Sequence, residues 1–182
     1  MKIAVTSLVE GENSFHFDSQ KEDWLKDLIQ DLSKEGYQFK SPMVVDASLT
    51  KVEPDFYLRG KLSCAVEQTC ARCAEPFDLK INSAFEVALA NVPSGKLRTP
   101  ELSEESEELD INFFEGHEID LNPIITEQFF LSLPYQSLCK PDCLGICQQC
   151  GTNLNTKMCQ CAEKKSLTPF SVLQEVKLFK QE

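Results

Sequence analysis

Six of the nine cysteines lie between residues 139 and 161, and their thiols are the groups in this sequence best suited to chemistry. Two closely spaced thiol pairs about ten residues apart are typical ligands of a tetrahedral zinc ion. The run Cys147-Gln148-Gln149-Cys150-Gly151 has the form of a zinc knuckle, in which a glycine lets the backbone turn over the metal. A second pair at residues 159 and 161 follows at a suitable distance. We therefore expect one structural zinc ion here.

The ligand set of this zinc ion stays open, because the segment offers more than four thiols. Cys147 and Cys150 form the expected first pair. The remaining two ligands are drawn from Cys143, Cys159 and Cys161. Cys139 is expected to stay unbound. A surplus of thiols favours a closed, structural site, since catalytic zinc keeps one position for water.

A second cysteine motif, Cys70-Ala71-Arg72-Cys73, lies in a loop between two predicted strands. Its thiols fit three interpretations: half of a metal site, a redox dithiol or a packed turn. A redox dithiol usually lies at a helix N-terminus, where the dipole lowers a thiol pKa, so the position between strands disfavours it. Arg72 can bind phosphate or carboxylate. We regard Cys70, Arg72 and Cys73 as candidate contacts for a partner or for RNA.

Three segments near residues 43–50, 56–67 and 77–89 alternate between apolar and polar side chains, which predicts half-buried antiparallel strands. The last two are long and joined by the short cysteine loop, so they should form a hairpin. Continued coiling of such strands predicts a curled or barrel-like sheet. Apolar residues at helical spacing predict flanking helices near residues 20–35 and 122–133.

The sequence therefore predicts an α+β fold with a small, cysteine-rich C-terminal zinc module. We expect a β-rich domain over residues 1–134, a zinc-binding module over residues 139–165 and a C-terminal helix over residues 166–182. A chain of 182 residues suits one domain with such an appendage.

The net charge of −11 comes from one acidic stretch. Residues 99–139 contain ten acidic residues and no lysine or arginine, which leaves 19 of the 29 acidic residues against 18 basic ones elsewhere. Such a stretch repels nucleic acid and suits a basic partner. Its section 101–110 also has the composition of a solvated loop, so its role stays open.

The sequence has no apolar run of about 20 residues, as a membrane span requires, and its first residues do not have the pattern of a signal peptide. We therefore expect a cytoplasmic protein with no membrane partner. In a reducing compartment, an odd number of cysteines favours metal ligation over a disulfide scaffold, which is the alternative.

No motif indicates a catalytic site. The two histidines, His16 and His117, have no nucleophile pattern beside them, and the sequence has no phosphate-binding glycine loop. The paired glutamates in section 101–110 are polar on all sides, whereas acid–base catalysis needs held carboxylates with separated pKa values. We expect a protein that is not an enzyme and that takes no small-molecule substrate.

Motifs in a fixed order along the chain resemble those of the YceD family, the large ribosomal RNA subunit accumulation proteins. Residues 70–77 match its C-x-R-C-x-E-P-F element. Residues 119–121 and 131–134 match its I-D-L and L-x-L-P elements. Residues 143–161 match its C-x-G-x-C-x-x-C-G-x-N-L-N element and the C-x-C pair that follows. The resemblance covers most of the chain from about residue 56 onward.

The resemblance implies a non-enzymatic ribosome-biogenesis factor that supports the accumulation of large-subunit ribosomal RNA. The implied partner is a large ribosomal subunit precursor, contacted through its rRNA or through a basic ribosomal protein. The chain departs from the family at Gln148, where many members have proline, and in its tail at residues 168–170, which lack the family's arginine. Two other functions stay open: a zinc-stabilised acidic adaptor unrelated to ribosomes, and a dithiol redox protein using Cys70 and Cys73.

Overall fold

A six-stranded sheet is the main element of the computed structural model, which describes residues 1–52, 55–92 and 111–163. Five strands follow the order β2-β4-β5-β6-β7, and β3 pairs with β5. The strands are β2 (Glu12–Asp18), β3 (Gln38–Phe39), β4 (Val44–Val52), β5 (Asp55–Thr69), β6 (Pro76–Val92) and β7 (Ile111–Glu115). All neighbours are antiparallel except β6 and β7, which are parallel.

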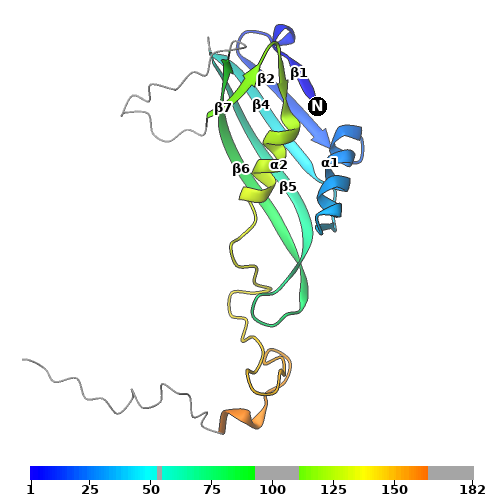
Figure 1. Cartoon of the computed structure of the whole chain (residues 1–182), viewed down its shortest axis with the longest axis vertical. Coiled ribbons are helices and arrows are strands. Elements are labelled where there is room, and N and C mark those ends of the chain that lie inside the picture. The colour runs from blue at the N-terminus through cyan, green and yellow to red at the C-terminus, as the bar shows by residue number, and fades with distance from the viewer. Residues whose placement is uncertain (53–54, 93–110, 164–182) are drawn as a thin grey trace, which may run out of the picture.

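Two α-helices pack against this sheet (Figure 1). They are α1 (Asp23–Lys34) and α2 (Leu121–Leu131). The other described elements are β1 (Lys2–Ala4), which pairs with β8 (Glu118–Asp120), and the 3₁₀ turns η1 (Val5–Ser7) and η2 (Gln160–Glu163). No helix among the described residues is long and apolar enough to cross a membrane. The predicted helix at residues 166–182 and the section 101–110 lie outside the described residues.

The α+β class is confirmed, and side chains near the start of each helix explain its boundary. Ser19 Oγ accepts a hydrogen bond from the Met43 N–H at 3.0 Å, just before β4. Ser19 therefore does not cap a helix, and α1 begins at Asp23. Asp120 caps α2, because its Oδ1 accepts from the Asn122 N–H at 3.0 Å. A side-chain cap of this kind satisfies a backbone donor that the helix itself leaves free.

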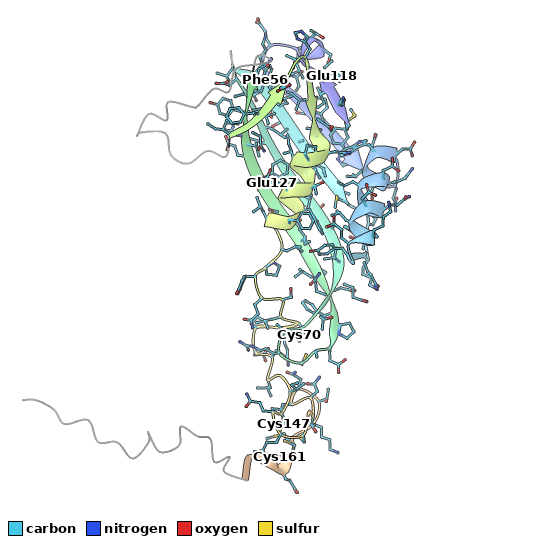
Figure 2. The ribbon with its side chains drawn as sticks, in the orientation of Figure 1. Phe56, Cys70, Glu118, Glu127, Cys147 and Cys161 are labelled. Carbon is cyan, nitrogen blue, oxygen red and sulfur yellow. The ribbon has the colours of Figure 1, made fainter. Side chains whose placement is uncertain are left out.

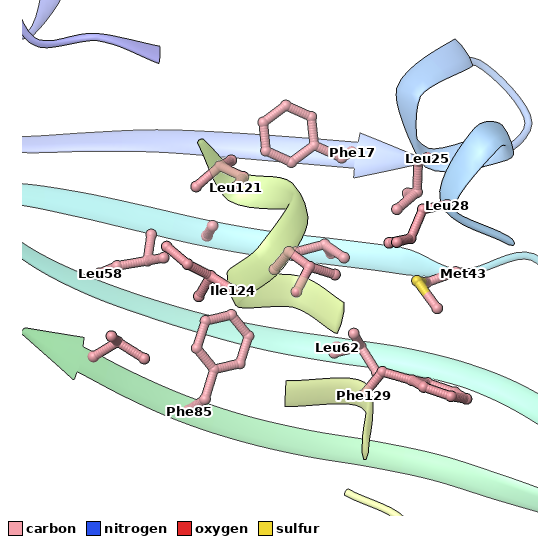
Figure 3. Packing of buried hydrophobic residues seen from close by; sticks show 14 of the residues in the cluster. Phe17, Leu25, Leu28, Met43, Leu58, Leu62, Phe85, Leu121, Ile124 and Phe129 are labelled. Carbon is pink, nitrogen blue, oxygen red and sulfur yellow. The ribbon is translucent and has the colours of Figure 1, made fainter. Parts of the chain in front are cut away.

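The alternating pattern places one face of the sheet against the helices. Strands β4, β5 and β6 send every second side chain into this core, and α2 covers it with Ile124 and Phe129, both buried (Figure 3). The opposite face carries exposed pairs such as Arg59 and Glu86, whose Nη2 and Oε1 atoms are 2.8 Å apart. Burial of the apolar face supplies most of the favourable free energy of such a fold.

The sheet is open, so the prediction of a barrel-like sheet is wrong on this point. Strand order leaves β2 and β7 at opposite edges, and no hydrogen-bonded ladder joins them among the described residues. The apolar face that a closed barrel would line with its own strands is covered by α1 and α2 instead. Closure would therefore remove the surface on which the helices bury their apolar side chains.

The β5–β6 hairpin extends far beyond the helices (Figure 1). Strand β5 has 15 residues, and at 3.3–3.4 Å per residue it is about 50 Å long. The pairing continues without interruption from Phe56 opposite Leu89 to Thr69 opposite Pro76. The helices cover only the part of this ladder nearest the other strands, so the hairpin carries its tip away from the main core (Figure 1).

Gly60 in β5 makes room for an aromatic ring on the core face. A Cβ atom added at Gly60 would overlap Cζ of Phe85 and lie 3.0 Å from the Asp46 carbonyl oxygen. Gly60 and Phe85 are register partners in the β5–β6 ladder, so the ring lies across the glycine. The glycine therefore serves the packing of the sheet, and its backbone needs no positive φ.

We predict that Gly60→Ala lowers the free energy of unfolding by about 1–3 kcal/mol, the usual cost of adding volume to a packed core. Chemical denaturation measures the change. The matched test is the same substitution in a Phe85→Leu background, where the smaller side chain should recover part of the loss. An equal cost of Gly60→Ala in both backgrounds contradicts this explanation of the glycine.

Candidate metal centres

The first thiol group, which we call the hairpin-tip site, consists of Cys70, Cys73, Cys139 and Cys143. Its sulfur atoms all lie within 4.8 Å of one another. Two of the distances, from Cys70 Sγ to Cys143 Sγ and from Cys73 Sγ to Cys139 Sγ, are 3.8 Å. A tetrahedron of sulfurs around zinc, with bonds of about 2.3 Å, has edges of about 3.8 Å. A disulfide would need about 2.05 Å, and all nine cysteines are free.

The hairpin-tip site is assembled from two segments far apart in the sequence. Cys70 and Cys73 lie in the turn between β5 and β6, while Cys139 and Cys143 lie in the chain that follows α2 and runs past that turn (Figure 2). Backbone hydrogen bonds join the segments: the Ala71 N–H donates to the Ser137 oxygen at 2.8 Å. Three of the four cysteines, all but Cys139, are buried.

The second thiol group, which we call the C-terminal site, is local. It consists of Cys147, Cys150, Cys159 and Cys161, whose sulfur atoms also lie within 4.8 Å of one another. All four fall within one short stretch that ends in η2, beyond the hairpin tip (Figure 2). Cys150 is exposed and the other three are partly exposed, so this site is more open to solvent than the first.

Both sites contain the same knuckle, built on the same two backbone hydrogen bonds. The Cys70 N–H donates to the Glu75 oxygen, and the Cys70 oxygen accepts from the Ala74 N–H, both at 2.9 Å. Cys147 makes the corresponding bonds with the residues four and five positions further on, both at 2.8 Å. The residue after the second thiol has a positive φ in each case, 57° at Ala74 and 71° at Gly151.

Electrostatics in the hairpin-tip site favour a bound cation. Hydrogen bonds from the backbone N–H groups of Cys139 and then Cys73 lower the pKa of Cys70 to about 6, although desolvation by itself would raise it. Desolvation and then the neighbouring thiols of Cys70 and Cys143 raise the pKa of Cys139 to about 12. Four thiols cannot all ionise to thiolates in so small a volume without a compensating positive charge. A divalent metal ion would supply that charge.

In the C-terminal site, too, one thiol has a lowered pKa and another has a raised pKa. The Thr152 hydroxyl, whose oxygen is 3.2 Å from the Cys150 sulfur, is the largest cause that lowers the pKa of Cys150 to about 6. The neighbouring Cys150 thiol, followed by burial, raises the pKa of Cys161 to about 12. The site thus also holds more thiols than can be charged without a cation.

Asn155 links the two sites. Its Nδ2 donates to the Cys143 sulfur at 3.3 Å, and its Oδ1 accepts from the Leu144 N–H at 3.0 Å. Desolvation alone would raise the pKa of Cys143, but the Asn155 side chain and the Gly145 N–H lower it below its ordinary value. A side chain of the loop around the C-terminal site therefore supports a thiol of the hairpin-tip site, as partners of metal ligands do.

Arg72, a candidate partner contact, makes contacts within the molecule. Its Nη1 donates to the Cys143 oxygen at 3.0 Å, and its own carbonyl accepts from the Ile146 N–H at 3.0 Å. These bonds hold the chain after Cys143 against the hairpin tip. A contact between Arg72 and a partner stays a prediction.

The structure groups the cysteines differently from the single site expected from the sequence. Cys147, Cys150, Cys159 and Cys161 lie together, as that expectation allows. Cys143 and Cys139, however, lie with the pair from the hairpin loop.

A count of cysteines could have indicated two sites. Cys64 is buried on the core face of β5, where burial raises its pKa to about 12, so it is a small core residue. The eight remaining thiols make two sets of four. Asn155 was missed as well, and only its place in the family's N-L-N motif could have pointed to it.

Fold and sites together define an open α+β protein with two four-thiol groups at the end of a long hairpin. The family described as "Large ribosomal RNA subunit accumulation protein YceD" matches residues 58–177. The chain therefore belongs to the YceD family. The matched range begins in β5 and contains both cysteine groups.

Curated relatives agree with this family. A Zea mays protein named large ribosomal RNA subunit accumulation protein YCED homolog 1, chloroplastic, is 27% identical over 154 residues, covering 71% of this chain and 52% of the relative. The Arabidopsis thaliana protein of the same name is 26% identical over 171 residues, covering 76% and 50%. An uncharacterized Mycobacterium bovis protein is 30% identical over 110 residues, covering 60% and 50%.

The chain thus spans about half the length of the curated relatives it matches. No solved structure matches it.

We predict that two glycines with similar backbone conformations differ in their tolerance of alanine. Gly145 and Gly151 have φ of 76° and 71°, so both substitutions cost about 1–2 kcal/mol of backbone strain. A Cβ at Gly145 would also lie 3.0 Å from the Arg72 carbonyl oxygen, whereas a Cβ at Gly151 meets nothing within 4 Å. Gly145→Ala should therefore lower thermal stability more than Gly151→Ala. Equal losses contradict the close packing of the hairpin tip against residue 145.

Proposed function

We propose that this protein supports the accumulation of large-subunit ribosomal RNA as a non-enzymatic factor that binds an assembling large ribosomal subunit. The observation that carries the proposal is membership of the YceD family over residues 58–177. The relatives from Zea mays and Arabidopsis thaliana carry the same role in their names. The proposal places the protein in the cytoplasm, with the ribosomes that it serves.

The arm formed by the hairpin tip and the cysteine-rich segment is the proposed contact surface. It lies far from the main core and ends in the C-terminal site (Figure 1). Three apolar side chains of this segment are exposed: Leu144 (66%), Ile146 (44%) and Met158 (88%). Exposed apolar side chains on a rigid support are typical of a protein contact.

Charge favours a protein partner over direct contact with RNA phosphates. A zinc ion held by four thiolates would leave its site at a formal charge of −2, and among the described residues of the arm the cations Arg72, Lys140 and Lys157 are few and separate. Tight RNA binding usually rests on clustered lysine and arginine. A basic ribosomal protein of the large subunit is therefore the favoured partner, with rRNA as the alternative.

The chemistry of the thiol groups supports a non-enzymatic role. Four thiols close a tetrahedral site and leave no position for water or substrate. Cys70 and Cys73 belong to such a set, which does not favour their use as a redox pair. We further propose that the C-terminal site holds one structural zinc ion through Cys147, Cys150, Cys159 and Cys161.

We predict that the protein co-sediments with large-subunit precursors at low salt and that Met158→Lys weakens this association, because it places a positive charge on a surface proposed to meet a basic partner. The matched control is Val9→Lys, an exposed apolar residue (64%) between η1 and β2, at the end of the molecule away from the arm (Figure 1), which should bind as the parent does. Gradient sedimentation of cell extracts measures both. Crosslinking in cells then separates a protein partner from rRNA.

A protein that stays at the top of the gradient at every salt concentration contradicts the ribosomal role. Equal weakening by Met158→Lys and Val9→Lys contradicts the contact surface but leaves the ribosomal role standing. Crosslinks to one protein unrelated to ribosomes would favour the zinc-stabilised adaptor instead.

We predict that a strong chelator increases hydrogen exchange in residues 143–163 much more than in β4, because the described part of the C-terminal segment has no large apolar core and would lose its crosslink with the metal. Mass spectrometry of exchanged peptides measures the difference. β4, whose core-facing residues Val45 and Leu49 are fully buried, is the internal control. Unchanged exchange in residues 143–163 contradicts a structural metal at the C-terminal site.

A further inference from the structure

We propose that the hairpin-tip site binds a second zinc ion of its own, through Cys70, Cys73, Cys139 and Cys143, and that this ion fastens the segment after α2 to the end of the β5–β6 hairpin. The protein then carries two zinc ions per chain. This inference is independent of the ribosomal role, because it rests on the chemistry of the four thiols alone.

The positions of the sulfurs fit one tetrahedral ion. Two opposite pairs of sulfurs are separated by 3.8 Å, the edge expected for zinc–sulfur bonds of about 2.3 Å. All four sulfurs lie within 4.8 Å of one another. A cluster of several iron atoms would have to hold its cysteines further apart, and tetrahedral coordination by four thiolates is the preferred environment of zinc.

The surroundings of the thiols are those of a metal site. The knuckle at Cys70 has the same pair of backbone hydrogen bonds as the knuckle at Cys147. Asn155 Nδ2 donates to the Cys143 sulfur at 3.3 Å, a bond that favours a thiolate. Ala74 holds a φ of 57°, which costs an alanine about 1–2 kcal/mol and needs a local source of stability.

Apolar packing at the hairpin tip is too small to provide that stability. Among the described residues, the buried cluster there consists of Cys70, Cys73 and Cys143, with Phe77 and Leu138 packed against it. It is separate from the main core, which contains the buried residues of the sheet and both helices. Structures with so little apolar surface usually depend on a metal or a disulfide, and no disulfide is present.

The two sites differ in how they form. The thiols of the C-terminal site span residues 147–161, so this short segment can collect them without the rest of the fold. In the hairpin-tip site, Cys73 and Cys139 are 66 positions apart, and Cys70 and Cys143 are 73 apart. Only the paired β5–β6 hairpin and α2 bring them together. Metal binding at the hairpin tip is therefore coupled to the folding of the sheet.

The experiment counts metal ions on the full chain, using native mass spectrometry after loading with zinc and titration with cobalt. The parent should hold two ions, and the double variants Cys70→Ser/Cys73→Ser and Cys159→Ser/Cys161→Ser should hold one each. Cys64→Ala removes a thiol that belongs to neither site and should hold two. Cobalt bound at either site should show the visible absorption of tetrahedral tetrathiolate coordination.

A ligand exchange keeps the test decisive if the double variants fold poorly. Cys139→His keeps four ligands, since zinc also accepts three thiolates and one imidazole, so it should still hold two ions with a shifted cobalt spectrum. A parent that binds one ion overturns the proposal. A cobalt spectrum that Cys139→His leaves unchanged also overturns it.

Urea denaturation of the parent gives a second readout. The metal of the hairpin-tip site should be released together with the loss of strand structure, measured by circular dichroism and a zinc-sensitive dye. In the variant Cys159→Ser/Cys161→Ser, the single release step should coincide with unfolding. Release of that ion well before the sheet unfolds contradicts the coupling between the site and the sheet.

Discussion

The antiparallel pairing of β5 and β6 is the interaction on which the rest of this structure depends. At one end, the ladder provides the middle of the sheet on which α1 and α2 bury their apolar side chains. At the other end, it continues beyond the helices and holds the knuckle of Cys70 and Cys73 in a fixed place. A long hairpin is marginally stable in water by itself. The core stabilises its base, and another interaction must stabilise its tip.

The proposed zinc ions would stabilise the tip where apolar burial ends. The chain after α2 runs alongside the hairpin tip, bonded to it through Ala71, Arg72 and the four sulfurs of the hairpin-tip site. This arrangement makes an arm from segments that are too small to form a hydrophobic core of their own. Asn155 and the bond from the Leu154 N–H to the Gly145 oxygen, at 2.9 Å, then connect the arm to the C-terminal site.

The arm gives a physical basis for the role implied by the family. A surface that projects from the body of a protein can reach into a large assembling particle, and both thiol groups lie on such a projection, away from the main core (Figure 2). The exposed apolar side chains of the arm, and the negative charge that the proposed zinc–thiolate centres would carry, suit a basic protein better than an RNA backbone. The relatives' names connect the family with large-subunit ribosomal RNA, and the arm is where we look for that connection.

Elements whose signals are local could be predicted from the amino-acid sequence. Period-two alternation identified β4, β5 and β6, helical spacing identified α1 and α2, and short spacing brought Cys147, Cys150, Cys159 and Cys161 into one group. Local patterns suffice there, because each depends on neighbours a few positions away. The same patterns did not show whether the sheet closes, since closure depends on which strands become edges and which face the helices cover.

Which cysteines belong together at the hairpin tip depends on the fold. The sequence predicts that Cys139 stays unbound and makes Cys143 one of three candidates for the last two places of the C-terminal group, because in sequence both lie close to that group. The fold brings them instead to Cys70 and Cys73, more than sixty positions away. Spacing along the chain cannot reveal such a group. Its members meet only after the long hairpin has paired and α2 has directed the following chain past its tip.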